Sequence, residues 1–397
     1  MASQREQQQS YSERPDLDVP DFEERCEFVL ERIDNNIDKY RTSFPSSATG
    51  PEMDYDEWDV TDWTPSFWTG MLWLAYEHTG DEKYREVAEG HLDAYEDRLE
   101  NTEHIMEGTL THDIGFLYSL SAVAQYRLTG NERARQVGLF ATDRLVDRFH
   151  DAPGIIQAWG DHRDPDDVEY GSTIVDSIMN LPLLYWASEE TGYDRYRTIA
   201  DIHAEQLAEH FVRDDYSTYH VYKFDVETGE PIRHRAERGA NYDSESCWAR
   251  GQAWAVYGFP LAYRYSGNEA FREMGRNVTE YYLNNLPEDH VPRWDFGAPE
   301  DHIRDSSSAA IAASGLIELA SCLPAGDPDR QRYLNASLAM LDSLGQNYTT
   351  KGADSEALLR EAKYANDPDD PNNAAIFGDY YYYEALTRVT RDWESYW

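Results

Sequence analysis

Residues 174–196, IVDSIMNLPLLYWASEETGYDRY, contain the pattern that decides the fold. An apolar, aromatic-rich stretch with helical spacing runs into a turn that contains Gly192, and a charged amphipathic stretch follows. Glycine is the residue type expected in the left-handed conformation where a helix ends. The segment therefore predicts a helical hairpin, with a buried helix over about 171–187 and an amphipathic helix after it.

The same pattern recurs along the chain. It is found at residues 66–84, 113–133, 174–196 and 248–271, in a degenerate form at 307–333, and without a following partner at 377–389. The corresponding turn glycines are Gly80, Gly130, Gly192, Gly267 and Gly326. An amphipathic helix predicted over about 21–40 can supply the partner that the last copy lacks. The repeat thus predicts an all-α (α/α)6 barrel with six inner and six outer helices, and an open helical solenoid is the alternative.

Composition supports one large folded unit. The 397 residues are 41% hydrophobic and 13% aromatic, which provides for a sizeable core and argues against a disordered acidic protein. Residues 1–19 are polar and are predicted to be disordered. Residues 20–397 are predicted to form a single catalytic barrel domain.

The charge balance is strongly acidic. Against 76 acidic residues stand 35 basic ones, for a net charge of −41, so a nucleic-acid partner is not expected. Such a surface is typical of a halophilic protein, because in molar salt the screening length falls to about 3 Å. No membrane span and no secretory leader is visible, which predicts a cytoplasmic protein. The three cysteines form neither a disulfide framework nor a metal motif.

A closed ring would bring several polar residues together. They lie at or just before the starts of the six inner helices, which meet at one end of the barrel. These residues are Trp63, Asp113, Asp176, Trp248, Arg250, Asp305, Ser306 and Asp379. We therefore expect a concave site at that end, with a few polar groups converging on it.

Asp113 and Asp176 are the candidate catalytic acids. Thr111, and Ser172 or Thr173, are expected to cap the two helices and so to place both acids in first turns. Two nearby acids repel, so one pKa should rise and the other fall, which suits an acid/base residue beside a charged helper. The alternative is that each is an ordinary acid at a helix N-terminus.

Flat aromatic side chains and an arginine complete the candidate site. Trp63, Trp159, Trp248 and Trp254 could stack on a sugar, and Arg250 could bind a carboxylate with its two-pronged guanidinium group. The alternative is that most of these tryptophans belong to the core. His112 and His220 are isolated, and motifs for metal, nucleotide or serine-nucleophile chemistry are missing, so no metal and no cofactor is expected.

Several blocks of sequence together resemble the unsaturated glucuronyl hydrolases, glycoside hydrolase family eighty-eight. They include DWTPSFWTGMLWLAYEHTGDEKYRE, HDIGFLYSLSA, STIVDSIMNLPLLYWA and SCWARGQAWAVYGF, and they are specific only in combination. The resemblance covers about residues 20–397. It implies an (α/α)6 barrel, in agreement with the repeat.

The resemblance also implies roles. Asp176 falls on the family's general acid/base and Asp113 on its second essential aspartate. The implied substrate-binding residues are Trp63, His112, Trp159, His220, Trp248, Arg250 and Trp254. The implied reaction is hydration of the Δ4,5 double bond of an unsaturated uronic acid at the non-reducing end of lyase-generated oligosaccharides, which are the expected partners.

Some features leave alternatives open. Ala240 stands near where family members often carry a substrate-binding Gln, and the acidic stretch before residue 378 has no basic cluster for sulfate, which favours unsulfated substrates. The acidic surface predicts activity that rises with salt. The alternatives are the sister family of unsaturated rhamnogalacturonyl hydrolases, a sugar epimerase or inverting glycosidase on the same fold, and a non-catalytic carbohydrate-binding barrel. The parent polysaccharide and the oligomeric state stay open.

Overall fold

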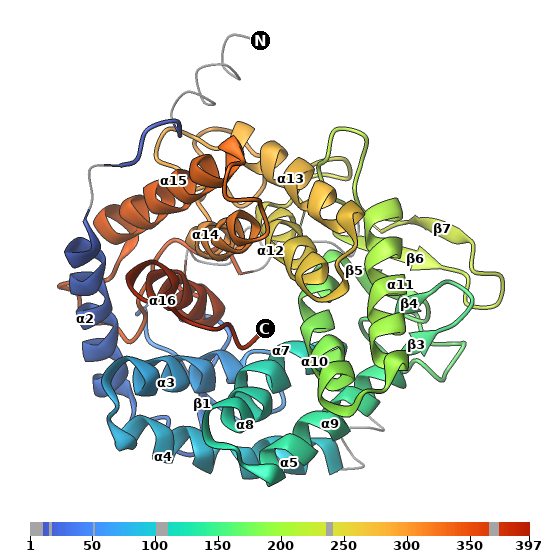
Figure 1. The fold of residues 1–397 in the computed structure, drawn as a ribbon, viewed down its shortest axis with the longest axis horizontal. Helices are drawn as coiled ribbons and strands as arrows, with labels where there is room; N and C mark the ends of the chain where they lie inside the picture. The colour runs from blue at the N-terminus through green and yellow to red at the C-terminus, as the bar shows by residue number, and fades with distance from the viewer. Residues whose placement is uncertain (1–10, 16–17, 51, 101–109, 236–240, 365–372) are drawn as a thin grey trace.

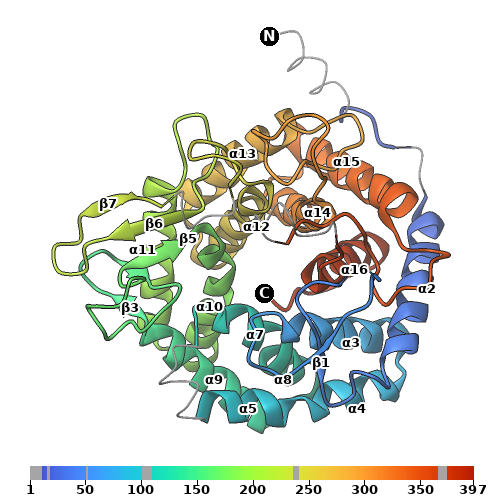
Figure 2. The same cartoon turned by 180° about the vertical axis from the view of Figure 1, so that it is seen from behind.

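The computed structural model describes residues 11–15, 18–50, 52–100, 110–235, 241–364 and 373–397, and these form two concentric rings of helices (Figures 1 and 2). The inner ring consists of α3 (Pro65–Thr79), α7 (Ile114–Tyr118) with the π-helix η1 (Ser119–Val123) and α8 (Ala124–Thr129), α10 (Leu181–Thr191), α12 (Ala249–Ser266), α14 (Ser306–Ser321) and α16 (Ile376–Thr390). The outer ring consists of α2 (Val19–Asn36), α4 (Glu82–Gly90) with α5 (Leu92–Glu100), α9 (Glu132–Val146), α11 (Asp194–His210), α13 (Glu269–Asn284) and α15 (Pro328–Ser343). The predicted barrel is confirmed.

The two ends of the chain close the ring. The last inner helix, α16, packs against the outer helix α2 and against the first inner helix, α3. The apolar face of α2, with Phe22, Cys26 and Val29 fully buried, covers α16 on its outer side. The pairing of the first and last helices, predicted from their complementary patterns, is therefore what the structure contains.

Four of the five turn glycines behave as predicted. Gly80, Gly130, Gly192 and Gly267 end inner helices with φ between 68° and 71°. In that left-handed region a side chain with a Cβ is strained. Gly326 is the exception, because α14 already ends at Ser321 and is capped by Cys322 in the right-handed conformation. Pro324, which has no backbone N–H, follows and prevents continuation of the helix.

Short strands form small sheets between some of the helices. The two-stranded sheets are β1 (Phe44–Pro45) with β2 (Glu57–Trp58), and β3 (Phe149–His150) with β4 (Ile155–Ile156). An antiparallel three-stranded sheet has the order β5–β6–β7, formed by β5 (Ser172–Ile174), β6 (Val221–Phe224) and β7 (Pro231–His234). In this sheet Ile174 lies opposite Val221, which places the start of the third inner helix beside the segment that leads into β6.

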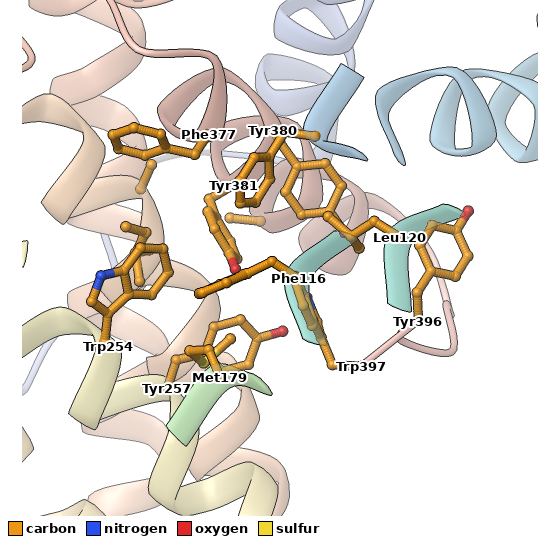
Figure 3. Packing of buried hydrophobic residues seen from close by; sticks show 14 of the residues in the cluster. Phe116, Leu120, Met179, Trp254, Tyr257, Phe377, Tyr380, Tyr381, Tyr396 and Trp397 are labelled. Atoms are coloured by element: carbon orange, nitrogen blue, oxygen red, sulfur yellow. The ribbon is translucent and has the colours of Figure 1, made fainter. Parts of the chain in front are cut away.

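Aromatic side chains fill the centre of the barrel (Figure 3). Phe116 from α7 packs on Trp254 from α12 with ring centroids 5.3 Å apart, and Trp254 packs on Tyr381 from α16 at 5.4 Å. The ring of Trp397 stacks on Tyr381 at 5.9 Å, so the end of the chain occupies the axis of the ring. The barrel is thus a packed core and not a channel.

The N-terminal stretch departs from its prediction at Tyr11. This side chain is 3% exposed, and its hydroxyl lies 2.9 Å from His290 Nδ1. Asn335 Nδ2 donates a hydrogen bond to the Tyr11 carbonyl at 2.9 Å. The chain is anchored to the outer ring at this residue, while residues 1–10 and 16–17 lie outside the described residues. In the described ranges, no helix combines the length and the apolar character that crossing a membrane requires.

Candidate active site

The segment that carries Asp176 is not a continuous α-helix. Residues Ser172–Ile174 form strand β5, residues Val175–Asn180 form the 3₁₀-helix η2, and the α-helix α10 begins only at Leu181. The predicted helix over 171–187 is therefore wrong in its first half. The β-branched residues Thr173 and Ile174 pair with β6, and Pro182 is tolerated in a helix only within the first turn.

The predicted helix caps are also corrected. Asp113 is itself the N-cap residue of α7, and Thr111 Oγ1 donates a hydrogen bond to Asp113 Oδ2 at 2.6 Å. Ser172 and Thr173 lie in β5, and the residue that precedes η2 is Ile174. Thr111 thus orients the carboxylate of Asp113, and neither acid is held by a conventional serine or threonine cap.

Asp176 is a nearly buried acid that lacks a strong partner. Its side chain is 14% exposed, and Oδ1 has no hydrogen-bond partner among the described residues. His220 Nε2 lies 3.6 Å from Oδ1, too far for a hydrogen bond. Burial, followed by the negative charge of Asp113, raises the pKa of Asp176 to about 7, and Arg250 opposes this rise. An acid with this pKa can both hold and release a proton near neutral pH.

Asp113 is the more acidic member of the pair. Burial raises its pKa to about 6, against the opposing effects of the Thr111 hydrogen bond and of the positive charges of Arg98 and Arg148. The expectation that one pKa would rise and the other fall is therefore corrected. Both rise, because burial acts on both acids, and the negative charge of Asp113 adds to the rise at Asp176.

His220, Trp248 and Trp159 lie together on one side of Asp176. The rings of His220 and Trp248 are 4.3 Å apart, and Trp159 meets His220 edge-on at 6.5 Å. The backbone N–H of Val175 donates to the His220 carbonyl at 3.0 Å, which ties this histidine to the strand that precedes Asp176. Three residues predicted from distant blocks thus form one wall of the site.

Arg250 binds backbone carbonyls of its own chain. Its Nη1 donates to the Lys363 carbonyl at 2.9 Å, and its Nη2 donates to the Tyr364 carbonyl at 2.7 Å. Its guanidinium lies 4.7 Å from the ring centres of both Trp248 and Phe377. The group expected to bind a substrate carboxylate is therefore engaged in holding residues 363–364 over the starts of the inner helices.

Trp63 holds the same segment from the opposite side. Its Nε1 donates to the Tyr364 hydroxyl at 3.1 Å, and its ring lies 5.2 Å from that of Phe377. It remains partly exposed, so one face is available beside the site. Tyr364 is a residue that the sequence did not single out, because nothing in its local pattern indicates that two site residues converge on it.

His112 and Trp254, expected among the substrate-binding residues, are fully buried in this structure. His112 lies behind Asp113, with Nε2 3.4 Å from Asp113 Oδ1, and burial lowers the pKa of His112 to about 3. Trp254 lies in the aromatic core and its Nε1, which lies near Asp176, has no hydrogen-bond partner among the described residues. Trp254 opposes the rise in the pKa of Asp176, and His112 lies against Asp113 within the protein.

Asp305 and Asp379, the other acids at helix starts, have structural partners. Asp305 caps α14 by accepting from the backbone N–H groups of Ser307 and Ser308. Asp379 accepts from the backbone N–H groups of Leu358 and Leu359 at 3.0 and 2.9 Å. These two acids hold the chain around the site. Ala240 and residues 365–372, whose composition bears on substrate choice, lie outside the described residues.

Comparisons with known proteins agree with one family. The sequence model of Glycosyl Hydrolase Family 88 matches residues 35–292. The unsaturated glucuronyl hydrolase of Bacillus sp. (strain GL1) is 43% identical over 366 residues, which cover 91% of this chain and 95% of that protein. The unsaturated chondroitin disaccharide hydrolase of Streptococcus pneumoniae (strain ATCC BAA-255 / R6) is 38% identical, with 98% and 96% of the two chains covered. A crystal structure of the unsaturated glucuronyl hydrolase of Streptococcus agalactiae superposes with a TM-score of 0.90 at 38% identity, over 96% and 94% of the two chains.

Proposed function

Because this chain belongs to glycosyl hydrolase family 88 and is an unsaturated glucuronyl hydrolase, we propose that Asp176 is its general acid and base. The observation that carries the proposal is the setting of this carboxyl group. It is buried beside a second acid, its pKa is raised to about 7, and one of its oxygens has no hydrogen-bond partner among the described residues. General acid/base catalysis is most efficient when the pKa lies near the working pH.

The proposed reaction is the hydration of a vinyl ether. Asp176 gives its proton to C4 of the Δ4,5 double bond, and positive charge develops on C5 and the ring oxygen. Water then adds at C5 and returns a proton to Asp176, and the hemiketal so formed opens and releases the rest of the oligosaccharide. The ionised Asp113 stabilises the positive charge and keeps Asp176 protonated beforehand.

Exchange of Asp176 for asparagine tests this role. Asp176→Asn should lower kcat by about 10²-fold or more, because the amide cannot transfer the proton. Turnover is followed by the loss of double-bond absorbance with an unsaturated disaccharide. Glu205→Gln makes the same chemical change on the exposed face of the outer helix α11 and should leave kcat unaltered. Near-normal turnover by Asp176→Asn would show that another group protonates C4.

The proposed substrates are oligosaccharides with an unsaturated uronic acid at the non-reducing end. Curated relatives carry the names unsaturated glucuronyl hydrolase and unsaturated chondroitin disaccharide hydrolase, which supports this class over rhamnogalacturonyl products. We further propose a preference for unsulfated substrates, because residues 365–372, ANDPDDPN, carry three aspartates and no basic residue. Comparison of kcat/KM for unsulfated and 6-sulfated unsaturated chondroitin disaccharides tests the preference, and faster turnover of the sulfated one would contradict it.

We also propose that the enzyme works in concentrated salt. A net charge of −41 repels an anionic substrate at low ionic strength, and salt screens that repulsion. The value of kcat/KM should therefore rise between low and molar salt. A neutral substrate analogue with an esterified carboxyl group is the control, since its capture should depend on salt much less. A flat or falling profile for the anionic substrate would contradict the proposal.

A further inference from the structure

Building on the proposed roles of Asp113 and Asp176, we propose that Asn180 is a positioning residue that fixes the tautomer of His112. In this arrangement the proton of His112 is on Nε2, the nitrogen nearest to Asp113. Asn180 therefore favours the ionised form of Asp113, which acts beside Asp176 in the reaction. Among the described residues, the Asn180 side chain bonds to the Phe116 N–H and to His112, and to neither acid.

The orientation of the Asn180 amide follows from one backbone hydrogen bond. The N–H of Phe116 donates to Asn180 Oδ1 at 2.8 Å in a buried position. A backbone N–H can only donate, so the amide oxygen must be on that side and the amide nitrogen on the other. Nδ2 then lies 3.4 Å from His112 Nδ1. Because an amide nitrogen only donates, His112 Nδ1 must be the acceptor.

The remaining contact of His112 is compatible with this assignment. Ser177 Oγ lies 2.9 Å from His112 Nδ1, and Thr173 Oγ1 lies 3.0 Å from Ser177 Oγ. A hydroxyl group donates or accepts as required, so Ser177 can accept from Thr173 and donate to His112. Ser177 adapts to the tautomer, whereas Asn180 dictates it.

His112 is neutral, so the choice of tautomer decides which atom faces Asp113. Burial, aided by the charge of Arg148, lowers the pKa of His112 to about 3. With Nδ1 as acceptor the single proton is on Nε2, which lies 3.4 Å from Asp113 Oδ1 but makes no hydrogen bond among the described residues, so it acts on the carboxylate through its partial positive charge. A proton there favours the carboxylate, whereas a lone pair would repel it. The other charged or titratable groups that act on this pair are Arg98, Arg148, Asp62, Asp176 and His203.

Close packing holds Asn180 in place. A Cβ at Gly115 would come within 2.3 Å of Asn180 Cα and 2.4 Å of Oδ1, so only glycine permits this approach of α7 to η2. Gly115 and Asn180 are therefore a matched pair: the missing side chain of one lets the amide of the other reach the Phe116 N–H.

The tautomer can be measured directly in the complete enzyme. Nitrogen-15 labelling of histidine and the two-bond couplings to the ring protons distinguish the Nε2–H form from the Nδ1–H form, and loss of one signal set in His112→Gln assigns the residue. We expect the Nε2–H form in the wild type and also in Asp113→Asn, because Asn180 and not the acid fixes it. The Nδ1–H form in either protein would overturn the proposal.

The pH profile gives the functional readout. Asn180→Leu removes the donor at similar volume, so Asp113 should become harder to ionise and Asp176 easier. The acidic limb of kcat/KM should move up and the alkaline limb down, each by about half a pH unit. Ser177→Ala keeps the Asn180 donor and should move neither limb. Unmoved limbs in Asn180→Leu would overturn the proposal, since a merely structural role would lower the whole profile. The tautomer measurement is independent of turnover, so it separates this proposal from the role of Asp176.

Discussion

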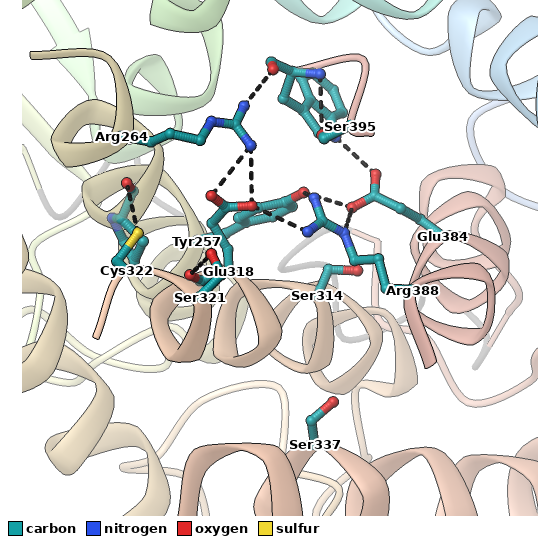
Figure 4. A network of polar contacts seen from close by, with 12 residues as sticks. Tyr257, Arg264, Ser314, Glu318, Ser321, Cys322, Ser337, Glu384, Arg388 and Ser395 are labelled. Carbon is teal, nitrogen blue, oxygen red and sulfur yellow. Dashed lines mark hydrogen bonds and ion pairs between the residues drawn. The ribbon is translucent and has the colours of Figure 1, made fainter. Parts of the chain in front are cut away.

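The two ends of the barrel bury acids in opposite ways. At the end where the inner helices finish, Glu318 binds Arg264 at 3.1 Å and Arg388 at 3.0 Å, and Glu384 binds Arg388 at 3.0 Å (Figure 4). At the end where the inner helices start, the described residues offer only a histidine within ion-pair distance of Asp113 and of Asp176, at 3.4 and 3.6 Å.

This difference separates structural acids from reactive ones. An arginine beside a buried carboxylate compensates for the lost hydration and keeps it ionised. Where that partner is missing, burial raises the pKa until the proton becomes available near neutral pH. Arg250 does lie at the site end, but it is engaged by Asp305 and by the carbonyls of residues 363–364. At the reactive end, Arg250 is thus bound to groups other than the two candidate catalytic acids.

The largest expected effect is a loss of stability at the paired end. Glu318→Gln leaves the buried Arg388 with less compensation and should lower the free energy of unfolding by about 3 kcal/mol. Urea unfolding measures it. Activity per folded molecule should not change, because Glu318 lies far from the helix starts. If stability were unaltered, the contrast between the two ends would not rest on ion pairing.

The same acid-to-amide change at the site end, Asp176→Asn, should stabilise the folded protein at pH 8 and not destabilise it. The folded-state pKa of Asp176, about 7, is above its ordinary value of 3.8, so folding favours the protonated form. Its contribution to stability is complete below pH 3.8 and is lost as the pH rises through 7. Asp176→Asn should therefore be more stable than the wild type at pH 8, by about 2 kcal/mol, and should show no gain near pH 3. A loss of stability at pH 8 would contradict this account.

Removal of Asp113 should show how much its negative charge contributes to the pKa of Asp176. Asp113→Asn deletes the negative charge that helps to raise the pKa of Asp176. The alkaline limb of the kcat/KM profile should move down by about one pH unit, in addition to a fall in kcat. The measurement is turnover of an unsaturated disaccharide between pH 4 and 9, a range of about two to three units on each side of both pKa values. An unmoved alkaline limb would mean that burial alone sets the pKa of Asp176.

The smallest expected effect concerns residues 363–364, to which Arg250 and Trp63 donate hydrogen bonds. Tyr364→Phe removes the hydroxyl that accepts from Trp63 Nε1, while the backbone carbonyl that Arg250 binds remains. One hydrogen bond is worth about 1 kcal/mol, so KM should rise by about fivefold at most with little change in kcat. Tyr348→Phe, which removes a hydroxyl bonded to Asp289, is the control. A fall in kcat alone would give Tyr364 a different role.

The ring of helix pairs could be predicted from the sequence because its signals are local. Helical spacing, turn glycines at positions 80, 130, 192 and 267, and an unpaired last repeat all follow from the order of residues. The local pattern gave a wrong prediction where hydrogen bonds to a distant strand determine the structure. Residues 172–174 fall at the start of the predicted buried helix and yet form a strand, because β6 provides hydrogen bonds to them.

The sequence indicated which residues belong to the candidate site, but not which groups surround each of them. The repeat placed Asp113 and Asp176 at one end of the barrel, and the family resemblance suggested their roles. The sequence could not show that Arg250 binds residues 363–364, that His112 lies behind Asp113, or that Asn180 reaches the N–H of Phe116. The contacts of Arg250 and Asn180 join residues that are far apart in the chain, and the orientation of His112 behind its neighbour Asp113 depends on the elements packed around both.

What the sequence determined by itself is therefore the architecture, since helix formation and helix pairing depend on patterns within a few dozen residues. What only the tertiary structure decided is the protonation of the acids. A pKa depends on burial and on the charges that the fold brings close, and for Asp176 both the burial and the neighbouring charge of Asp113 come from separate elements that pack together only in the folded protein.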